Sequence, residues 1–447
     1  MYFPTALLTE RASVNTGLAA MLRNSIAILT VSLLLASCTS KQGEPTAAVE
    51  TPLSVGVLIY GDTGYHPDYP DQDDYVDLFS EEEFLAAEWA DWLEDKRPPD
   101  DFEARPHSVS PVTGKVVAAT GMFGISEAMT NFCRDSATCD FGVLLGDNIY
   151  PSGATLGTDG FDDAQRFKEI LQDPFGSVGD VASGYLTYVT MGNHDWETSR
   201  DGGFVQIEYL EQASGFYMDG PYYSVKPPSA NGEVELFIVD TNMILANSEV
   251  REDTLNDDGS EGPLGEIEPF DYNTGQLTED EKQQPQWLEN ALKNSTAKWK
   301  LVIAHHPLWS SSGSKFEQAR VLREKLMPAL CKYADAYLVG HEHTLEIHTD
   351  SCEATLGQST EKPLVQILSG AGAKQRPLNS NFMAHQEEKY PEHKTLFAEG
   401  MLWGFAHMQM ENDVANVVLI SIPDDASPEM TTIYEYEFGR RSHLINE

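Results

Sequence analysis

The stretch FGVLLGDNIY at residues 141–150 joins an apolar strand to a carboxylate and a tyrosine. Residues 141–145 are apolar or glycine, which predicts a strand buried on both faces. Asp147 then follows a glycine, and Tyr150 comes three residues later. A single carboxylate after a strand is usually part of a turn. A functional role for Asp147 and Tyr150 therefore depends on whether other strands of this chain end in the same way.

Four other strand-like runs do end in short polar motifs. They are GDTG at 61–64, GNHD at 192–195, HHP at 305–307 and GHEH at 340–343. In open α/β sheets, ligands bind beyond the carboxyl ends of the strands. Five ends that carry Asp, Asn or His therefore predict that these side chains gather into one metal site.

The rest of the chain has the pattern of an α/β domain. Apolar strand-like runs span residues 55–60, 141–145, 186–190, 235–239, 301–304, 336–339, 364–368 and 414–420. Helical spacing of apolar residues follows a capping box at 80–83 and recurs at 285–292 and 318–330. Alternating strands and helices over this length predict sheets that are covered by helices.

Composition limits the possible partners. A hydrophobic content of 41% in 447 residues indicates a globular chain with a sizeable core. The formal net charge of −42 excludes nucleic acid, which needs a basic surface, but a small anionic substrate is compatible because a local metal charge can dominate a site. Two acidic insertions, at about 66–106 and 249–281, are interpreted as solvated loops, since neither has the ligand spacing of an EF-hand calcium loop.

The first 38 residues are predicted to be an export signal. Arg23 precedes an apolar run, 26–35, that is too short to span a bilayer, and the sequence LASC at 35–38 follows. LASC resembles the lipobox of bacterial lipoproteins, in which the cysteine is lipidated; an ordinary secretory signal is the alternative. Translation would begin at Met1 or at Met21. We therefore expect a protein exported from a bacterial cell and lipid-anchored through Cys38 on the periplasmic face or cell surface, or otherwise periplasmic or secreted.

A polar linker, 39–52, is predicted to join this signal to one domain at 53–447. Four cysteines remain in that domain and allow three pairings. Neighbours in sequence are the simplest choice, Cys133 with Cys139 and Cys331 with Cys352, because exported cysteines tend to pair. A metal–thiolate site is not expected, since no CxxC spacing occurs.

The ordered set GD, GDNxY, GNH, H and GHxH resembles the calcineurin-like metallophosphoesterases, and within them the small, tartrate-resistant type of purple acid phosphatase. Tyr150 carries the narrower resemblance, which extends over roughly residues 54–422. It is supported by QIEY at 206–209, PYY at 221–223, SGAG at 369–372 and GFA at 404–406. The resemblance implies a four-layer sandwich, two mixed β-sheets flanked by helices, with the active site at the carboxyl ends of the strands.

By position, the resemblance implies two neighbouring metal ions. The first, iron(III) in the family, would be bound by Asp62, Asp147, Tyr150 and His343. The second, divalent iron, zinc or manganese in the family, would be bound by Asp147, Asn193, His305 and His341. Asp147 would bridge the ions with its two oxygens. Phenolate and carboxylate donors suit iron(III), while Asn and His suit a divalent ion.

The implied reaction is hydrolysis of a small phosphate monoester, with a metal-bound hydroxide attacking phosphorus in line. His194 is the candidate to bind the phosphate or to protonate the leaving group, and Asp195 is a candidate to orient it. The chain departs from the family pattern twice. Thr63 stands where the family has a tryptophan, and no histidine follows the His-x-Pro segment, where Lys315 or a nearby serine could contact phosphate instead.

Two other functions stay open from the sequence. One is a phosphodiesterase or nucleotide hydrolase of the same superfamily, which the lack of an obvious base-binding patch makes less favoured. The other is a non-catalytic surface lipoprotein that binds calcium or a protein through its acidic loops. Every ligand position is filled, which argues against loss of catalysis. The sequence leaves the oligomeric state open.

The lipobox gives a direct test. Cys38→Ser should yield a soluble or unprocessed protein, whereas the wild type should partition with membranes, because only the wild type can receive the lipid. Immunoblots of membrane and soluble fractions measure the distribution. Wild-type protein found wholly in the soluble fraction would disprove the anchor.

Overall fold

The computed structural model describes residues 53–69, 78–158, 160–251, 256, 258–262, 268–269, 273–313 and 316–441. The chain divides into two units, residues 1–50 and 51–447, and all described residues belong to the second. The predicted signal, Cys38 and the linker at 39–52 lie outside the described residues. Among the helices of these ranges, none is long and apolar enough to cross a membrane.

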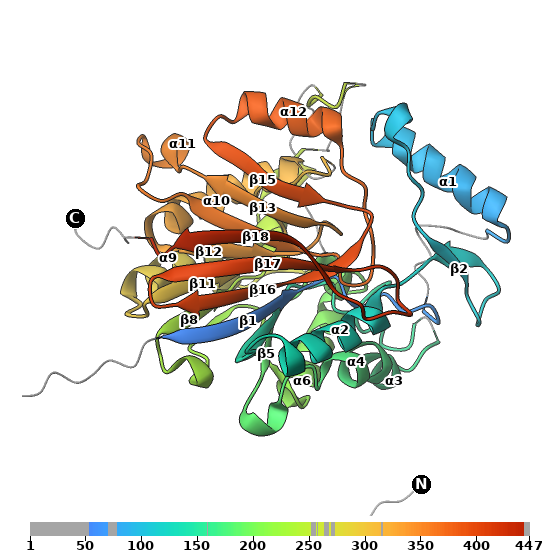
Figure 1. Ribbon diagram of the computed structural model, residues 1–447, viewed down its shortest axis with the longest axis horizontal. Helices are drawn as coiled ribbons and strands as arrows, with labels where there is room; N and C mark the ends of the chain where they lie inside the picture. Colours follow the sequence, from blue (N-terminus) through green and yellow to red (C-terminus); the bar gives the residue numbers. More distant parts are fainter. Residues whose placement is uncertain are drawn as a thin grey trace, which may run out of the picture. The chain divides into compact units, whose positions relative to one another are not determined.

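Two mixed sheets of seven strands each form the centre of the second unit (Figure 1). The first has the order β18 (Thr431–Gly439), β17 (Val414–Ile422), β16 (Trp403–Glu411), β1 (Ser54–Tyr60), β4 (Phe141–Leu144), β5 (Thr187–Val189) and β6 (Phe216–Tyr217). The second has the order β15 (His393–Glu399), β13 (Leu345–Asp350), β14 (Leu364–Ser369), β12 (Ala336–Val339), β11 (Trp299–Ile303), β8 (Val234–Ile238) and β7 (Tyr223–Val225).

Two small ribbons accompany the sheets, β2 (His107–Val109) with β3 (Val116–Ala118) and β9 (Glu249–Val250) with β10 (Glu268–Pro269). The longer helices are α1 (Glu81–Glu94), α2 (Met122–Asp135), α6 (Arg200–Gln212), α9 (Gln284–Asn294), α10 (Phe316–Tyr333) and α12 (Ser380–Lys389). Shorter ones are α3 (Asp163–Phe167), α4 (Asp173–Phe175), α5 (Asn193–Trp196), α7 (Thr241–Ala246), α8 (Glu279–Lys282) and α11 (Glu353–Leu356). Single turns occur at η1 (Pro99–Asp101), η2 (Lys168–Gln172), η3 (Val181–Ser183) and η4 (Pro228–Ala230).

The inner strands β8, β11, β12 and β14 of the second sheet are buried on both faces, which explains their mainly apolar runs. In β8, Leu236 and Ile238 belong to the core shared with the first sheet, whereas Phe237 packs in a second core with Leu288 of α9 and Leu322 of α10. Successive side chains of a strand point to opposite faces, so one apolar strand serves both cores. Helix α2 packs on β16 and β17 of the first sheet. Helix, sheet, sheet and helix follow one another, which confirms the predicted four-layer α/β sandwich.

The acidic insertion at 66–106 is partly helical rather than wholly an open loop. Helix α1 begins at the predicted capping box, in which Ser80 and Glu83 satisfy each other's main-chain N–H groups, an arrangement worth about 1 kcal/mol. Phe84 of α1 is buried against the 116–118 strand of the adjoining ribbon. Figure 1 shows α1 and β2 beside one another at the edge of the view. Residues 78–106, the described greater part of the insertion, therefore pack as part of the domain.

Both predicted disulfides are present. Cys133, in α2, pairs with Cys139, just before β4, and their Cα atoms are 5.4 Å apart. Cys331, near the end of α10, pairs with Cys352, and these Cα atoms are 5.7 Å apart. Asp350 lies close enough to the second pair to suggest a metal-binding group. Because both thiols are in the disulfide, that group is not a thiolate metal site.

Candidate metal centre

The five strand ends singled out in the sequence meet at one place. Strands β1, β4 and β5 run parallel, with Tyr60 opposite Leu144 and Leu144 opposite Val189. In the other sheet, β11 and β12 run parallel, with Ile303 opposite Leu338. Parallel strands in this register end at the same edge, so the residues that follow them share that edge. The turns after these strands carry every predicted ligand.

Sharp backbone turns aim the ligands. Asp62, Asp147 and His341 have φ angles of 55°, 50° and 71°, in the left-handed region that residues other than glycine rarely adopt. Such conformations cost on the order of 1–3 kcal/mol each and persist where the surrounding structure enforces them. Here they turn three side chains back across the ends of the strands.

The glycines that precede two of the ligands leave room for the carboxylates. A Cβ atom on Gly192 would lie 2.1 Å from Asp147 Oδ1, and one on Gly340 would lie 2.4 Å from Asp62 Oδ2. Both distances are far inside van der Waals contact. The pairing of glycine with a polar residue in these motifs therefore has a steric cause, because only glycine lets the turns approach the carboxylates this closely.

Tyr150 lies at the centre of the first predicted ligand group. Its hydroxyl oxygen is 2.9 Å from Asp147 Oδ2, 3.3 Å from Asp62 Oδ1 and 3.2 Å from His343 Nε2. All four side chains are buried. The structure thus brings together the whole set that the resemblance assigned to the first metal ion.

The second predicted group is equally close. His305 Nε2 is 3.1 Å from Asn193 Oδ1, 3.0 Å from His341 Nδ1 and 3.4 Å from Asp147 Oδ1. The other ring nitrogen of His305 lies 2.8 Å from the Leu145 carbonyl oxygen, which fixes the orientation of the ring. Asp147 is common to both groups, as the sequence predicted.

The donor set fits metal ions. The ligand atoms of Asp62, Asp147 and His305 lie within 4.8 Å of one another, as do those of His305, His306 and His341. Burial, together with the charges of Asp147 and Asp62, raises the pKa of the Tyr150 phenol well above its usual 10. A Lewis-acidic cation at this position would supply the positive charge that holds Tyr150 as a phenolate.

Metal binding requires neutral imidazole, so the pKa values of the two histidines bear on whether the site can hold a metal ion. Burial, reinforced by the cations Arg376 and Lys374, lowers the pKa of His343 well below 6.5. His305 differs: burial opposes its protonation, but the neighbouring Asp147 carboxylate outweighs burial and raises the pKa to about 9. A metal ion between Asp147 and His305 would take the place of that proton.

His194 stands at the mouth of the site. It is the second residue of α5, and its main-chain N–H donates to Asp147 Oδ1 at 2.9 Å. Its Nδ1 is 2.6 Å from the Pro151 carbonyl oxygen, so Nδ1 is the protonated nitrogen and Nε2 is left to face other groups. The side chain lines a cavity of about 140 Å³ together with Asp147, Asn193, His341 and His343.

Asp195 does not orient His194, contrary to the interpretation offered by the sequence. Its carboxylate is buried and accepts hydrogen bonds from the main-chain N–H groups of Asn148, Ile149 and Gly192 and from the side chains of Asn148 and Gln206, at 2.7–3.2 Å. The Pro151 carbonyl faces the imidazole instead. Asp195 therefore holds the 146–149 turn, which carries Asp147, against the 192–195 turn.

Sequence reasoning missed three cations at the cavity. Arg105, Lys374 and Arg376 line the same 140 Å³ space as the ligands. Lys374 Nζ also lies 4.7 Å from the centre of the Tyr150 ring. The available signal was Lys374 and Arg376 within four residues of the SGAG motif at 369–372, in a chain with few basic residues.

The structure shows where the residues at the first departure from the family pattern, and the serines at the second, lie. Thr63, at the tryptophan position, is fully buried. Ser310 and Ser312 contact each other, while the Ser311 main-chain N–H donates to Glu346. None of these serines is among the described residues that line the cavity, and Lys315 lies outside the described residues. The cations at the cavity come from other segments.

The comparisons with known proteins agree with this geometry. Residues 57–345 match the family model described as calcineurin-like phosphoesterase, which is more than half of the chain. The chain belongs to the calcineurin-like phosphoesterase family. It is 28% identical over 337 residues to the tartrate-resistant acid phosphatase type 5 of Mus musculus, covering 70% of this chain and 89% of the relative.

A further relative and a solved structure are also similar to this chain. Purple acid phosphatase 3 of Arabidopsis thaliana is 29% identical over 240 residues, covering 53% of this chain and 54% of the relative. Among solved structures, GAP50, the anchor in the inner membrane complex of Plasmodium, has a TM-score of 0.51 at 13% identity, covering 88% of this chain and 91% of that one; this likeness concerns the fold alone. Family membership, the phosphatase relatives and the donor set identify a metal-dependent phosphatase.

The place of Asp195 predicts a large structural effect. Asp195→Ala should lower the free energy of unfolding of the metal-free protein by several kcal/mol, because buried N–H groups lose a charged acceptor. Asp180→Ala, which removes an exposed helix cap bonded to Ser183, should cost only about 1 kcal/mol. Denaturant titration of both variants without metal measures the difference. Equal, small losses would show that Asp195 does not hold the turns.

Proposed function

We propose that this chain is a dinuclear phosphomonoesterase of the purple acid phosphatase type. The observation that carries the proposal is the position of the Tyr150 hydroxyl, within 3.3 Å of Asp62, Asp147 and His343. A phenol surrounded by two carboxylates and a neutral histidine suits iron(III), a hard and strongly charged ion. Such a donor set distinguishes a purple phosphatase from relatives without the tyrosine.

Two ions would share Asp147. Asp62, Asp147, Tyr150 and His343 would hold iron(III), and Asp147, Asn193, His305 and His341 would hold divalent iron, zinc or manganese. When bound, such a pair acidifies water and draws negative charge from the phosphoryl oxygens. His306 is a further nitrogen beside the second group, since its ring centre is 4.3 Å from that of His341. Its Nδ1 is 2.7 Å from Thr241 Oγ1, so we assign His306 to the support of His341.

The protein supplies orientation and a proton. The 140 Å³ cavity is large enough for a phosphoryl group and is lined by both ligand groups and by His194. With Nδ1 bonded to the Pro151 carbonyl, Nε2 is the nitrogen of His194 that remains to act on a molecule in the cavity. From there a protonated imidazole would donate its Nε2 proton to the oxygen of the departing alcohol.

A second proposal concerns location. We infer export and lipid anchoring at Cys38 from the LASC sequence at 35–38, as tested by Cys38→Ser above. A phosphodiesterase or nucleotide hydrolase of the same family stays the alternative activity. Rates on an aryl phosphate monoester and on the matching diester, measured with the same metal-loaded protein, separate the two. A higher kcat/KM for the diester would favour the alternative.

Tyr150 should give the oxidised, iron-loaded protein a purple or pink colour through charge transfer from phenolate to iron(III). Tyr150→Phe should abolish the visible band while the far-ultraviolet circular dichroism stays unchanged. Tyr60→Phe is a matched control, because Tyr60 is also buried but its hydroxyl bonds to Thr187. A visible spectrum that does not depend on Tyr150 would overturn the purple-phosphatase assignment and leave the family assignment intact.

Metal binding and proton transfer should separate by mutation. Asp147→Asn should reduce metal content and activity together, because Asp147 serves both ligand groups. His194→Ala should keep both metals, measured by atomic emission, yet lower kcat by about 10²–10⁴-fold on an alkyl phosphate. An activated aryl phosphate should show a much smaller loss, since its leaving group departs as a stable anion. Equal losses on both esters would rule out the acid role of His194.

A further inference from the structure

Arg105 belongs to the acidic insertion, yet its side chain lines the metal cavity. Glu88 of α1 fixes it closely: Arg105 Nε and Nη2 donate to Glu88 Oε1 at 2.9 and 2.7 Å, and the Arg105 main-chain N–H donates to Oε2 at 2.9 Å. The Arg105 side chain is 16% exposed and that of Glu88 is 6% exposed. The insertion thus delivers an oriented guanidinium to the site.

Arg376 approaches the same cavity from the second sheet. It follows β14, and its main-chain N–H donates to the His343 carbonyl oxygen at 3.1 Å. Its Nη1 pairs with the fully buried carboxylate of Glu342, the residue between two metal-ligand candidates. Arg376 is therefore tied to the GHEH turn at 340–343, as Arg105 is tied to α1.

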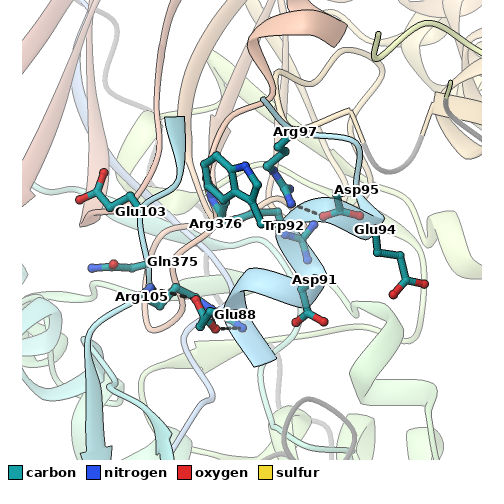
Figure 2. Close-up of a pocket in the computed structure, with 11 residues that line it drawn as sticks. Glu88, Asp91, Trp92, Glu94, Asp95, Arg97, Glu103, Arg105, Gln375 and Arg376 are labelled. Carbon is teal, nitrogen blue, oxygen red and sulfur yellow. Dashed lines mark hydrogen bonds and ion pairs between the residues drawn. The ribbon is translucent and has the colours of Figure 1, made fainter. Parts of the chain in front are cut away.

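These two arginines also border a second, larger space. A cavity of about 290 Å³ is lined by Arg105, Arg376, Trp92 and further residues of α1 and the 375–377 segment. Figure 2 shows Arg105 beside Glu88, with Arg376 behind α1 near the Arg97–Asp95 pair. Because both arginines belong to the two linings, the cavities adjoin at these side chains. A molecule held at the arginines can therefore have one end at the metals and the other in the larger cavity.

The chemistry of the pair fits a phosphoryl group. A guanidinium has five N–H donors in a rigid plane, an arrangement that matches the oxygens of a phosphoryl group. Partly buried ion pairs contribute little stability by themselves, because desolvation offsets the attraction. Two of them at the rim of a metal site are better explained by what they bind. Phosphoryl oxygens are the acceptors that arginine binds most strongly.

We propose that Arg105 and Arg376 form a clamp on the non-bridging phosphoryl oxygens, with the leaving group in the 290 Å³ cavity. The clamp gives the site its preference for monoester dianions over diester monoanions, since a monoester offers an additional charged oxygen. Glu88 and Glu342 act as positioning residues. This inference rests on the proposed phosphatase function and names the substrate class of the same site.

The test is Arg105→Ala in the full-length, metal-loaded protein. We expect KM for an aryl phosphate monoester to rise about 10- to 100-fold, the range for a hydrogen bond to a charged group, with a smaller change in kcat. Binding of inorganic phosphate, measured by calorimetry, should weaken by a similar factor, while metal content stays at the wild-type level. For the matching diester, kcat/KM should fall less, so the ratio of monoester to diester activity drops.

Three variants serve as controls. Arg134→Ala removes an exposed arginine that pairs with Asp135 at the end of α2. Its KM and phosphate affinity should match those of the wild type. Arg105→Lys keeps the positive charge but loses the planar set of N–H donors, so it should recover part of the phosphate affinity. Glu88→Gln should weaken phosphate binding partially, because it keeps the guanidinium but loosens its orientation. If Arg105→Ala does not fold, Arg105→Lys and Glu88→Gln carry the comparison.

The outcomes separate the clamp from the function on which it rests. A metal-loaded wild type that hydrolyses no phosphate ester would disprove the proposed function. An active wild type whose phosphate affinity and KM are unchanged in Arg105→Ala would overturn the clamp alone. Loss of metal in Arg105→Ala that Arg105→Lys does not restore would also overturn it, and would make Arg105 a support of the metal ligands.

Discussion

The carboxylate of Asp147 is the group on which the rest of the site depends. One oxygen accepts from the Tyr150 hydroxyl, and the other accepts from the His194 main chain and faces His305. These partners come from both sheets, so a single buried charge joins the two halves of the sandwich at their open edge. A buried carboxylate is costly unless it is paired or binds a metal. The close approach of the sheets, at which a Cβ atom on Gly146 would lie 2.7 Å from His305 Nδ1, is therefore stabilised by the same charge that would bind both ions.

Much of this site could be predicted because its residues lie in local motifs. A strand that ends in glycine and a polar residue is visible in the sequence, and the parallel register of β1, β4 and β5 brings such ends together. The long apolar strands were found for a related reason. Strands such as β4 and β12 are buried on both faces and therefore carry an almost unbroken apolar run. Local sequence and tertiary structure agree at these positions.

Other elements could not be predicted, because they carry polar side chains that are buried only through contacts formed in the folded chain. Strand β13 is fully buried yet carries Glu346, His348 and Asp350. His348 bonds to Glu346 at 2.6 Å and lies 2.9 Å from a ring nitrogen of His393 on β15. Burial of such a polar strand is stable because distant residues complete its hydrogen bonds. The role assigned to Asp195 failed for the same reason, since most of its partners are groups of the distant 146–149 turn and the side chain of Gln206.

Charge acts at two different ranges in this molecule. The net charge of −42 would repel a phosphate at long range, but ions in solution screen exposed charges beyond about 8–10 Å. Inside the cavity, Arg105, Lys374 and Arg376 line the same space as the ligands. Local cations and bound metals therefore decide which anions bind. The insertion contributes at both ranges. Its many carboxylates add to the long-range negative charge, while Glu88 positions Arg105, one of the local cations that the phosphoryl group would meet.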